Sequence, residues 1–180
     1  GLFRAPLRNT ILSALDMSLN RHFWRLFPAI LFIFNRLLGC NIRFQTLSEP
    51  FTIYCDGPLT PFFEEFECGV VLNSCQTSAE RRRYWENPSF KAEFSKQWTR
   101  GWPRTFHRDL SQIFVVSAPD KTLVDRSIEE IARAEGRDPV DHFMDLLERF
   151  DTELRWVSTG ANHRTPIRQA LMAHRHILPG

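Results

Sequence analysis

The chain has 180 residues, of which 43% are hydrophobic and 24% are charged, the make-up of a globular protein with length for about one domain. Its 23 basic and 21 acidic residues leave a net charge of +2, which gives no electrostatic reason to expect a nucleic acid or an anionic membrane as a partner. The longest apolar run, 26–34, falls well short of the roughly 20 residues that a bilayer span needs, and we expect it to form a core helix.

The four cysteines form no Cys-x2-Cys pair and have no pair of histidines nearby: Cys40, Cys55, Cys68 and Cys75. Structural zinc sites use such paired ligands, so we expect no zinc ligand among them. A chain with 16 Phe and 5 Trp does not need disulfides to hold its core. We therefore predict buried, reduced thiols. No segment has the layout of a signal peptide, and we expect a cytoplasmic location.

The first predicted region, residues 1–57, contains a helix and two short strands. Apolar residues recur at three- and four-residue steps over 23–38, which places one broad apolar stripe on a helix. Alternation of apolar and polar residues over 41–48 predicts a strand, and the β-branched and aromatic residues of 51–57 predict another that ends in an Asp-Gly turn.

The second region, residues 58–111, has a different texture. It begins without clean periodicity and continues with two polar helices, the second starting at the N-cap pair Asn87-Pro88. The arginines of 81–83 lie between glutamates, and we expect them on a solvated helix face. We interpret this region as an inserted lobe of mixed and helical structure.

The third region, residues 112–180, repeats strands and helices. Strands are predicted over 112–119, 154–160 and 176–180, with helices that start at Ser127, Asp138 and Thr165. This order is typical of a parallel α/β sheet. We predict that four strands lie parallel, those near Phe44, Val115, Val157 and Ile177.

Three stretches resemble one known family. They are "FQTLSEPFTIYCDGPLTPFFEEF" at 44–66, "LVDRSIEEIARAEGRDPVDHFMDLLERF" at 123–150 and "NHRTPIRQALMAHRHILPG" at 162–180. The order of a short helix ending in Gly, a "DP-x-D" helix start and a final "LPG" resembles the metal-dependent amidohydrolase superfamily, in particular its N-acyl-D-amino-acid deacylase (D-aminoacylase) group. Asp125 departs from this pattern, because the group often has Gly there.

The resemblance implies an α/β fold that is a partial TIM (β/α)8 barrel, made of late strands and helices with an inserted lobe. The chain would be an internal segment of a longer enzyme, ending at the start of the eighth barrel strand. That enzyme would use zinc to hydrolyse the amide bond of N-acyl-D-amino acids or related C–N bonds, with a metal-bound water whose pKa is lowered to about 7. Its partners would be the small-molecule N-acyl amino acid substrate and the remainder of the barrel.

No catalytic residue and no metal ligand is expected in this segment, which would be inactive alone. The candidates for lining the substrate pocket follow the strand at 155–157: Ser158, Thr159, Asn162 and His163. Residues at the C-terminal ends of barrel strands face the active site. The alternative is that these side chains make the turn and cap the next helix.

The other histidines are given structural roles. His174 and His176 form a His-x-His at a predicted helix end, where the helix dipole favours cations, and not in the place of the family's metal pair. His107 and His142 are expected at the surface. A different class of function is also open, an α-rich protein-binding or scaffold domain without catalysis that uses the 23–38 helix as its partner surface.

Overall fold

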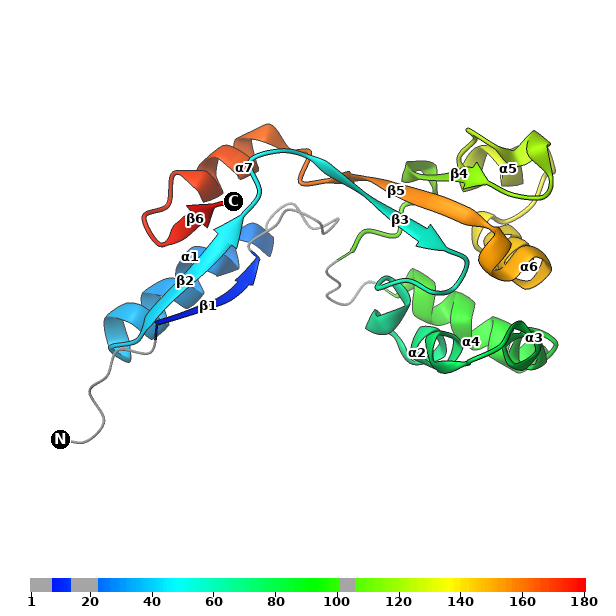
Figure 1. Cartoon of the computed structure of the whole chain (residues 1–180), viewed down its shortest axis with the longest axis horizontal. Helices are drawn as coiled ribbons and strands as arrows, with labels where there is room; N and C mark the ends of the chain where they lie inside the picture. Colours follow the sequence, from blue (N-terminus) through cyan, green and yellow to red (C-terminus); the bar gives the residue numbers. More distant parts are fainter. Residues whose placement is uncertain (1–7, 14–22, 101–105) are drawn as a thin grey trace. The chain divides into compact units, whose positions relative to one another are not determined.

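Figure 1 shows a computed structural model of the chain, which describes residues 8–13, 23–100 and 106–180. The fold is mixed α/β and divides into two compact units. Unit 1 comprises residues 1–51 and 160–180, and unit 2 comprises residues 52–159. This division differs from the three predicted regions, since unit 2 takes in both the 58–111 segment and most of the strands and helices expected after it.

Unit 1 contains one parallel sheet of three strands in the order β1-β2-β6. Phe44 pairs with Ile177, which confirms that the strands near these two residues are parallel. A strand at β1 was not predicted. The elements of unit 1 are β1 (Arg8–Ser13), η1 (Phe23–Arg25), α1 (Leu26–Phe32), the π-helical turn η2 (Ile33–Leu37), β2 (Asn41–Thr46), α7 (Thr165–Met172) and β6 (Ile177–Pro179).

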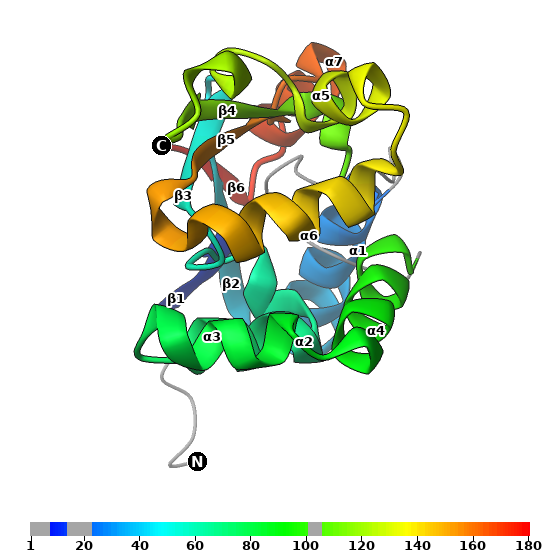
Figure 2. The ribbon, with the colours of Figure 1, turned by 90° about the vertical axis from the view of Figure 1, so that its right-hand side faces the viewer.

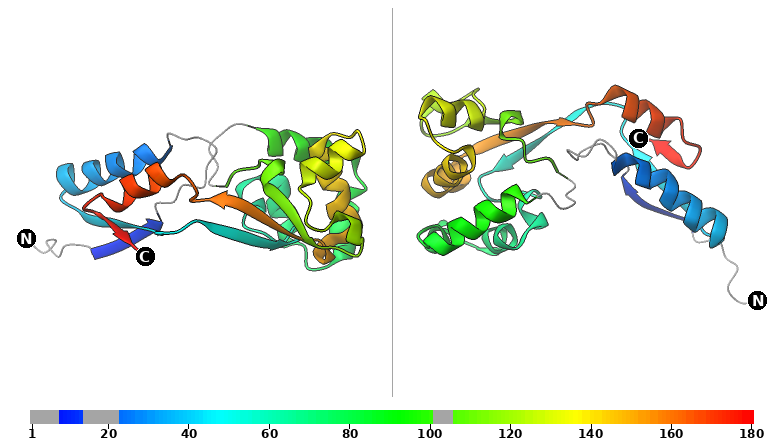
Figure 3. Two further views of the ribbon diagram at one scale, coloured as in Figure 1. Left: turned by 90° about the horizontal axis from the view of Figure 1, so that it is seen from above. Right: turned by 180° about the vertical axis from the view of Figure 1, so that it is seen from behind.

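Helices α1 and α7 cover one face of this sheet (Figure 3). Leu31 of α1 and Leu171 of α7 pack with Phe44 of β2 in a single apolar cluster. Successive residues of a strand point to opposite faces of the sheet, so the neighbours of Phe44 point away from these helices. The residues on the other face of β2, Arg43 and Gln45, are exposed. A parallel sheet is normally covered on both faces, so the second face of this sheet is open in the part of the chain that the structure describes.

Unit 2 begins and ends with strands and is helical between them. Its elements are β3 (Phe51–Asp56), η3 (Phe63–Glu65), α2 (Glu67–Ser74), α3 (Ser78–Trp85), α4 (Pro88–Thr99), η4 (Leu110–Gln112), β4 (Ile113–Ser117), η5 (Lys121–Leu123), α5 (Ile128–Ala134), α6 (Pro139–Phe150), η6 (Asp151–Glu153) and β5 (Arg155–Ala161). The predicted helix starts are confirmed. Asn87 caps α4 with Pro88 in its first turn, Ser127 opens α5 with a capping box, and Asp138 accepts two backbone N–H groups of α6.

The strands of unit 2 correct one prediction. They form a sheet in the order β3-β5-β4, and β4 pairs with β5 antiparallel, with Val115 opposite Trp156. The prediction that the strands near Val115 and Val157 are parallel is therefore wrong. A single helix between two strands returns the chain to its starting end, but here two helices, α5 and α6, pack on one another. Because the second helix reverses the chain again, the next strand runs the opposite way.

The core of unit 2 is aromatic. Helices α3, α4 and α6 lie beside one another (Figure 2) and enclose Trp85, Phe94 and Phe143, each at most 2% exposed. Trp156 of β5 is buried among these rings, 5.5 Å from that of Phe143 between ring centroids, and its indole N–H donates to the carbonyl of Gly57 at 2.9 Å. The donor of this large side chain is thus satisfied inside the core.

Three charged or titratable side chains of unit 2 are buried where the surface was expected. Arg81 is 4% exposed, His107 is 8% exposed and His142 is 3% exposed, so the prediction of a solvated face holds only for the neighbours of Arg81, and the two histidines are not surface residues. Arg81 and His107 are fixed by polar partners from distant segments, Asp151 and Ser158, which local patterns do not reveal. His142 has nearer partners, Glu135 and Arg137.

The four cysteines are free thiols, two buried (Cys55 and Cys68) and two half-buried (Cys40 and Cys75). Across residues 8–13, 23–100 and 106–180, no helix has the length and apolar character to cross a membrane. Neither of the two described sheets closes into a barrel.

Candidate functional site

The C-terminal edge of the parallel sheet in unit 1 gathers polar groups from three segments. The strands β2 and β6 end side by side there, and the backbone N–H of Gly180 donates to the carbonyl of Thr46 at 2.7 Å. The Thr46 hydroxyl is fully buried and has no hydrogen-bond partner within the described residues. A Cβ placed on Gly180 would lie 2.5 Å from the side-chain nitrogen of Gln45. In parallel α/β folds this edge is where ligands bind.

Asn162 braces the loop that leaves this edge. Its side-chain nitrogen donates to the backbone carbonyls of Leu47 at 2.8 Å and of Glu49 at 3.1 Å, and its backbone carbonyl accepts from the Arg168 guanidinium at 2.7 Å. The side chain is completely buried, and the backbone φ is +57°. Asn tolerates this left-handed conformation better than most residues. The amide therefore ties the segment after β2 to the segment before α7.

His163 stands next to this brace and is exposed. Its Nδ1 is hydrogen-bonded to the carbonyl of Gly160. A carbonyl only accepts, so Nδ1 carries the proton and Nε2 of the neutral ring holds a free lone pair. An exposed Nε2 of this kind can accept a hydrogen bond from a substrate amide.

The other two predicted pocket residues lie elsewhere. Ser158 and Thr159 belong to unit 2 and lie within β5, not after a strand, with Ser158 opposite Ile113 of β4. The structure therefore places the four candidates in two groups, and only Asn162 and His163 lie at the edge of the parallel sheet.

Ser158 contacts His107, a pairing that resembles a nucleophile and its base. The Ser158 hydroxyl is 3.0 Å from His107 Nε2, which is also 2.5 Å from the carbonyl of Thr159. The backbone N–H of Asp109 donates to His107 Nδ1 at 3.4 Å. Because Nδ1 accepts, Nε2 carries the proton and donates, so this ring cannot take a proton from Ser158. With Ser158 only 1% exposed, the contact is a structural clamp.

The buried thiols are also poor nucleophiles. Burial raises the pKa of the Cys55 thiol to about 11, although the Thr60 hydroxyl 3.0 Å away opposes the shift. Burial likewise raises the pKa of Cys68. Thiolate is the reactive and metal-binding form, so both side chains are inert at neutral pH.

Sequence reasoning missed Gln45 and Thr46, which lie inside a predicted strand. One signal was available in the sequence. Apolar and polar residues alternate along this strand up to Phe44, but Gln45 and Thr46 at its end are both polar, so each face of the strand ends in a polar side chain. Leu47 and Glu49, which accept from the Asn162 side chain, left no local signal, since they lie more than 110 residues away.

The described residues contain no cluster of three or more His, Cys, Asp or Glu side chains able to hold a metal ion. At the sheet edge, His163 and Glu49 are nitrogen and carboxylate donors, but a zinc site uses at least three protein ligands.

The comparisons with known proteins find relatives without an assigned role. The chain is 35% identical over 136 residues to an uncharacterized protein of Mycobacterium bovis, and equally so to uncharacterized proteins of two Mycobacterium tuberculosis strains. In each case the match covers 73% of this chain and 22% of the relative, so the chain spans about a fifth of the length of these curated relatives. No protein-family model matches it, and no solved structure matches it.

Proposed function

We propose that the chain is a segment of a zinc-dependent amidohydrolase of the N-acyl-D-amino-acid deacylase type, which hydrolyses the amide bond of N-acyl-D-amino acids or related C–N bonds. In this proposal unit 1 is an arc of a TIM barrel and unit 2 is inserted into it. One observation carries the proposal: β1, β2 and β6 are parallel neighbours in one sheet, with α1 between β1 and β2 and α7 directly before β6. Such repeated strand-helix units are the building pattern of that barrel.

The open face of the sheet supports the same reading. In a TIM barrel the helices cover the outside and the opposite face of each strand points into the barrel. Here α1 and α7 cover one face, while Arg43 and Gln45 project from the other. The remainder of the barrel, as the partner of this segment, would cover that face.

The backbone at Asp125 offers separate support. Its φ is +63°, a left-handed conformation that favours Gly. The resemblance expects Gly at this position, and the backbone has the conformation that Gly would adopt most easily.

The residues that the structure describes do not form a zinc site, so no reaction step is assigned to the metal here. The role proposed for this segment is to shape the substrate pocket. Asn162 fixes the loop after β2, and His163 offers a free Nε2 to a substrate amide. Ser158 and Thr159 support unit 2 and take no part in bond breaking.

The test is steady-state kinetics of the longer protein that carries this chain, on a panel of N-acyl-D-amino acids and their L-enantiomers. We expect hydrolysis of the D-substrates, loss on chelation and recovery with zinc. His163→Ala should change kcat/KM between substrates by about ten- to a hundredfold, the effect of one polar contact. Arg133→Ala, at an exposed position of α5, is the matched control. A zinc-loaded protein that hydrolyses none of the panel would overturn the proposal.

A second function, a protein-binding module, is favoured by the apolar surface of α1 and η2. Phe32 is 60% exposed, Leu37 is 65% exposed and Leu38 is 63% exposed, although the pattern predicted a buried stripe. Scattered exposed apolar residues are ordinary, but contiguous ones mark interfaces. Leu37→Ser with Leu38→Ser separates the two candidates: loss of a bound protein with hydrolysis retained favours the module, and loss of both favours contact within one enzyme.

A further inference from the structure

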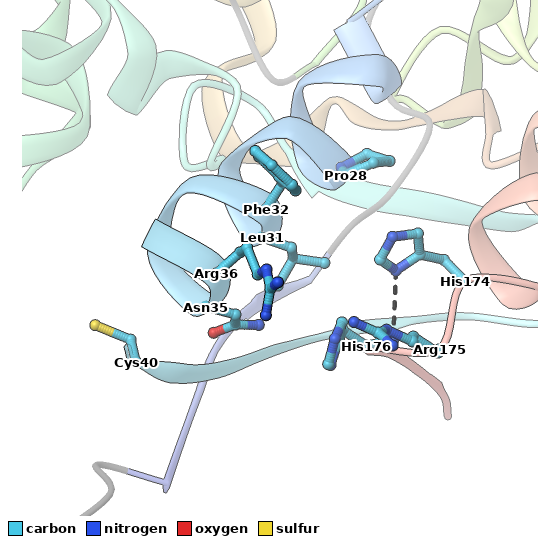
Figure 4. A pocket seen from close by; sticks show the side chains of 9 residues that line it. All are labelled: Pro28, Leu31, Phe32, Asn35, Arg36, Cys40, His174, Arg175 and His176. Atoms are coloured by element: carbon cyan, nitrogen blue, oxygen red, sulfur yellow. Dashed lines mark hydrogen bonds between the residues drawn. The ribbon is translucent and has the colours of Figure 1, made fainter. Parts of the chain in front are cut away.

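A cavity of about 460 Å³ lies in unit 1, between the α1–η2 segment and the loop that joins α7 to β6 (Figure 4). Figure 4 shows side chains of the two segments facing one another across it. Cys40 and His176 immediately precede β2 and β6, so the cavity lies at the N-terminal ends of the strands. The candidate site at Asn162 lies at the opposite edge of the same sheet.

The polar lining of the cavity is cationic and uncompensated. Arg36 and Arg175 line it, and within the described residues neither guanidinium has a hydrogen-bond or ion-pair partner. No carboxylate side chain lines the cavity. By contrast, a cavity of about 590 Å³ in unit 2 is lined by four carboxylates and three arginines. One of these arginines, Arg137, is paired with Asp145.

His174 and His176 also line the cavity, and they add a ring N–H donor and a buried ring nitrogen. The backbone N–H of His176 donates to His174 Nδ1 at 3.3 Å, so the proton of the neutral His174 ring is on Nε2. His176 Nδ1 is buried with no partner in the described part of the chain. Burial lowers the pKa of His176, and the neighbouring side chains Arg175, His174 and Arg43 lower it further. An anion would relieve this repulsion.

The whole of unit 1 favours an anion. Its sequence has nine arginines, no lysine and two acidic residues, whereas unit 2 has 14 basic and 19 acidic residues. Glu49 is the only side-chain carboxylate in the described part of unit 1, and it lies beyond the other end of β2. The small net charge of the chain therefore conceals a strongly basic unit, whose field attracts anions.

The remaining lining is apolar. Pro28, Leu31 and Phe32 of α1 form one side of the cavity, opposite His174. Asn35 also lines it, but both ends of its amide are used by the backbone of Ile42, at 2.8 and 2.7 Å, so it leaves the recognition of a ligand to the arginines and His174. A ligand that fills the cavity thus meets cations on one part and hydrocarbon on another.

We propose that this cavity binds an amphiphilic organic anion, a carboxylate or phosphate head that lies against Arg36, Arg175 and His174 and carries an apolar group that packs on Phe32 and Pro28. Planar guanidinium groups hold such oxyanions with paired hydrogen bonds. The site goes beyond the proposed function and does not depend on it, since it lies at the other edge of the sheet.

Isothermal titration calorimetry of the 180-residue chain at pH 7 and 0.15 M salt tests this site. The probes are octanoate, octyl phosphate, inorganic phosphate and octanol. We expect saturable one-to-one binding of at least one of the two amphiphilic anions, which identifies the preferred head group, and much weaker binding of phosphate and octanol. Arg175→Gln should weaken this binding about tenfold, the value of a hydrogen bond to a charged group. Phe32→Ser should weaken it by a similar factor through lost apolar contact.

Arg25→Gln is the matched control, because it removes the same charge from unit 1 outside the cavity. Equal weakening by Arg25→Gln and Arg175→Gln would mean general attraction to a basic unit and would overturn the site. Octanol binding as tight as octanoate would remove the anion from the proposal, and phosphate as tight as octyl phosphate would remove the apolar group. Absence of saturable binding by both amphiphilic anions would refute it entirely. All three variants alter exposed side chains, and circular dichroism of each checks that it is folded.

Discussion

Arg81 and Asp151 form a two-pronged ion pair in unit 2. Arg81 Nε lies 2.7 Å from one carboxylate oxygen of Asp151, and Nη2 lies 2.7 Å from the other. A third bond runs from Nη1 to the carbonyl of Cys75 at 2.9 Å. The guanidinium on α3 thereby holds the end of α6 in a fixed position. It is the kind of planar, paired contact for which Lys is no substitute.

Removing the buried partner of this pair should be costly. We expect Arg81→Ala to lower the free energy of unfolding by about 3 kcal/mol, because it leaves the half-buried carboxylate of Asp151 without its cation. Arg83→Ala, two residues away and exposed, should stay within about 0.5 kcal/mol of the parent chain. Urea unfolding followed by circular dichroism measures both, and similar values for the two variants would contradict the assignment.

The pair also predicts how stability depends on pH. Burial by itself would raise the pKa of Asp151, but the hydrogen bonds from Arg81 and Ser78 outweigh it and hold the pKa below its ordinary value. The folded state thus favours the charged carboxylate, and its contribution is complete above the unfolded pKa of about 3.9. It is lost as the pH falls through the lower folded pKa.

The stability difference between the parent chain and Asp151→Asn should therefore be constant near neutral pH and shrink below about pH 3.9. Urea unfolding at a series of pH values measures it, and the other carboxyl groups cancel in the difference. A difference that grew in acid would show that the pKa is raised.

Two glycines with positive φ should differ in their tolerance of a side chain. Gly57 has φ +53°, and a Cβ there would lie 2.1 Å from the carbonyl oxygen of Asp151, whereas Gly136 has φ +66° and open space. Gly136→Ala should cost about 1 to 2 kcal/mol for the left-handed backbone alone. Gly57→Ala should cost about 1 to 3 kcal/mol more, since backbone must move. Thermal unfolding distinguishes them, and equal losses would mean that the close approach to Asp151 is absent.

The brace at Asn162 can be tested by changing one atom type. Asn162→Asp keeps the size of the side chain and its tolerance of positive φ, but it replaces the NH2 donor to Leu47 and Glu49 with an acceptor. We expect a loss of about 3 kcal/mol, because the fully buried side chain loses both hydrogen bonds and places a charge in their position. Hydrogen exchange of the backbone amides of residues 47–49 should speed up. His163→Ala, whose side chain is exposed, should leave the exchange unchanged, and a change in both would disprove a specific role of the amide.

Ser158 should not react as a nucleophile. We expect no labelling of Ser158 by a fluorophosphonate, which reacts with serines activated by a base, because the His107 ring donates from Nε2 and the hydroxyl is buried. Mass spectrometry after exposure to the reagent gives the answer. Labelling that disappears in His107→Ala would assign the pair a catalytic role instead.

Local chemistry in the sequence was enough to predict most of the helices and strands. Ser127, Asn87-Pro88 and Asp138 carry their capping information within three residues, and alternation identified β2. The direction of β4 and β5 depends on how α5 packs on α6, which no local pattern contains. The predicted parallel arrangement was therefore correct for β2 and β6 and wrong for β4 and β5, which are joined by two helices.

The candidate site was predicted only in part. Asn162 and His163 were chosen because they follow a strand, and they do directly follow β5, but the side chain of Asn162 bonds to the segment after β2, a neighbour that the prediction did not include. Ser158 and Thr159 were chosen by the same rule, but they lie inside β5 and face the partners of an antiparallel sheet. Burial of Arg81 depends on Asp151, 70 residues away. The sequence of three consecutive arginines does not indicate which of them is paired.

The neighbouring positions of β3 and β5 in one sheet have a consequence for how this chain can vary. These strands carry the chain into unit 2 and out of it, so the two ends of a 108-residue excursion, 52–159, are held together by hydrogen bonds. Closing a loop costs free energy that grows only with the logarithm of its length. Here the pairing of β3 with β5 closes the loop formed by unit 2. Residues can be gained or lost between those strands at little expense to the parallel sheet, which leaves natural variation free to rebuild unit 2 while β2 and β6 keep their register.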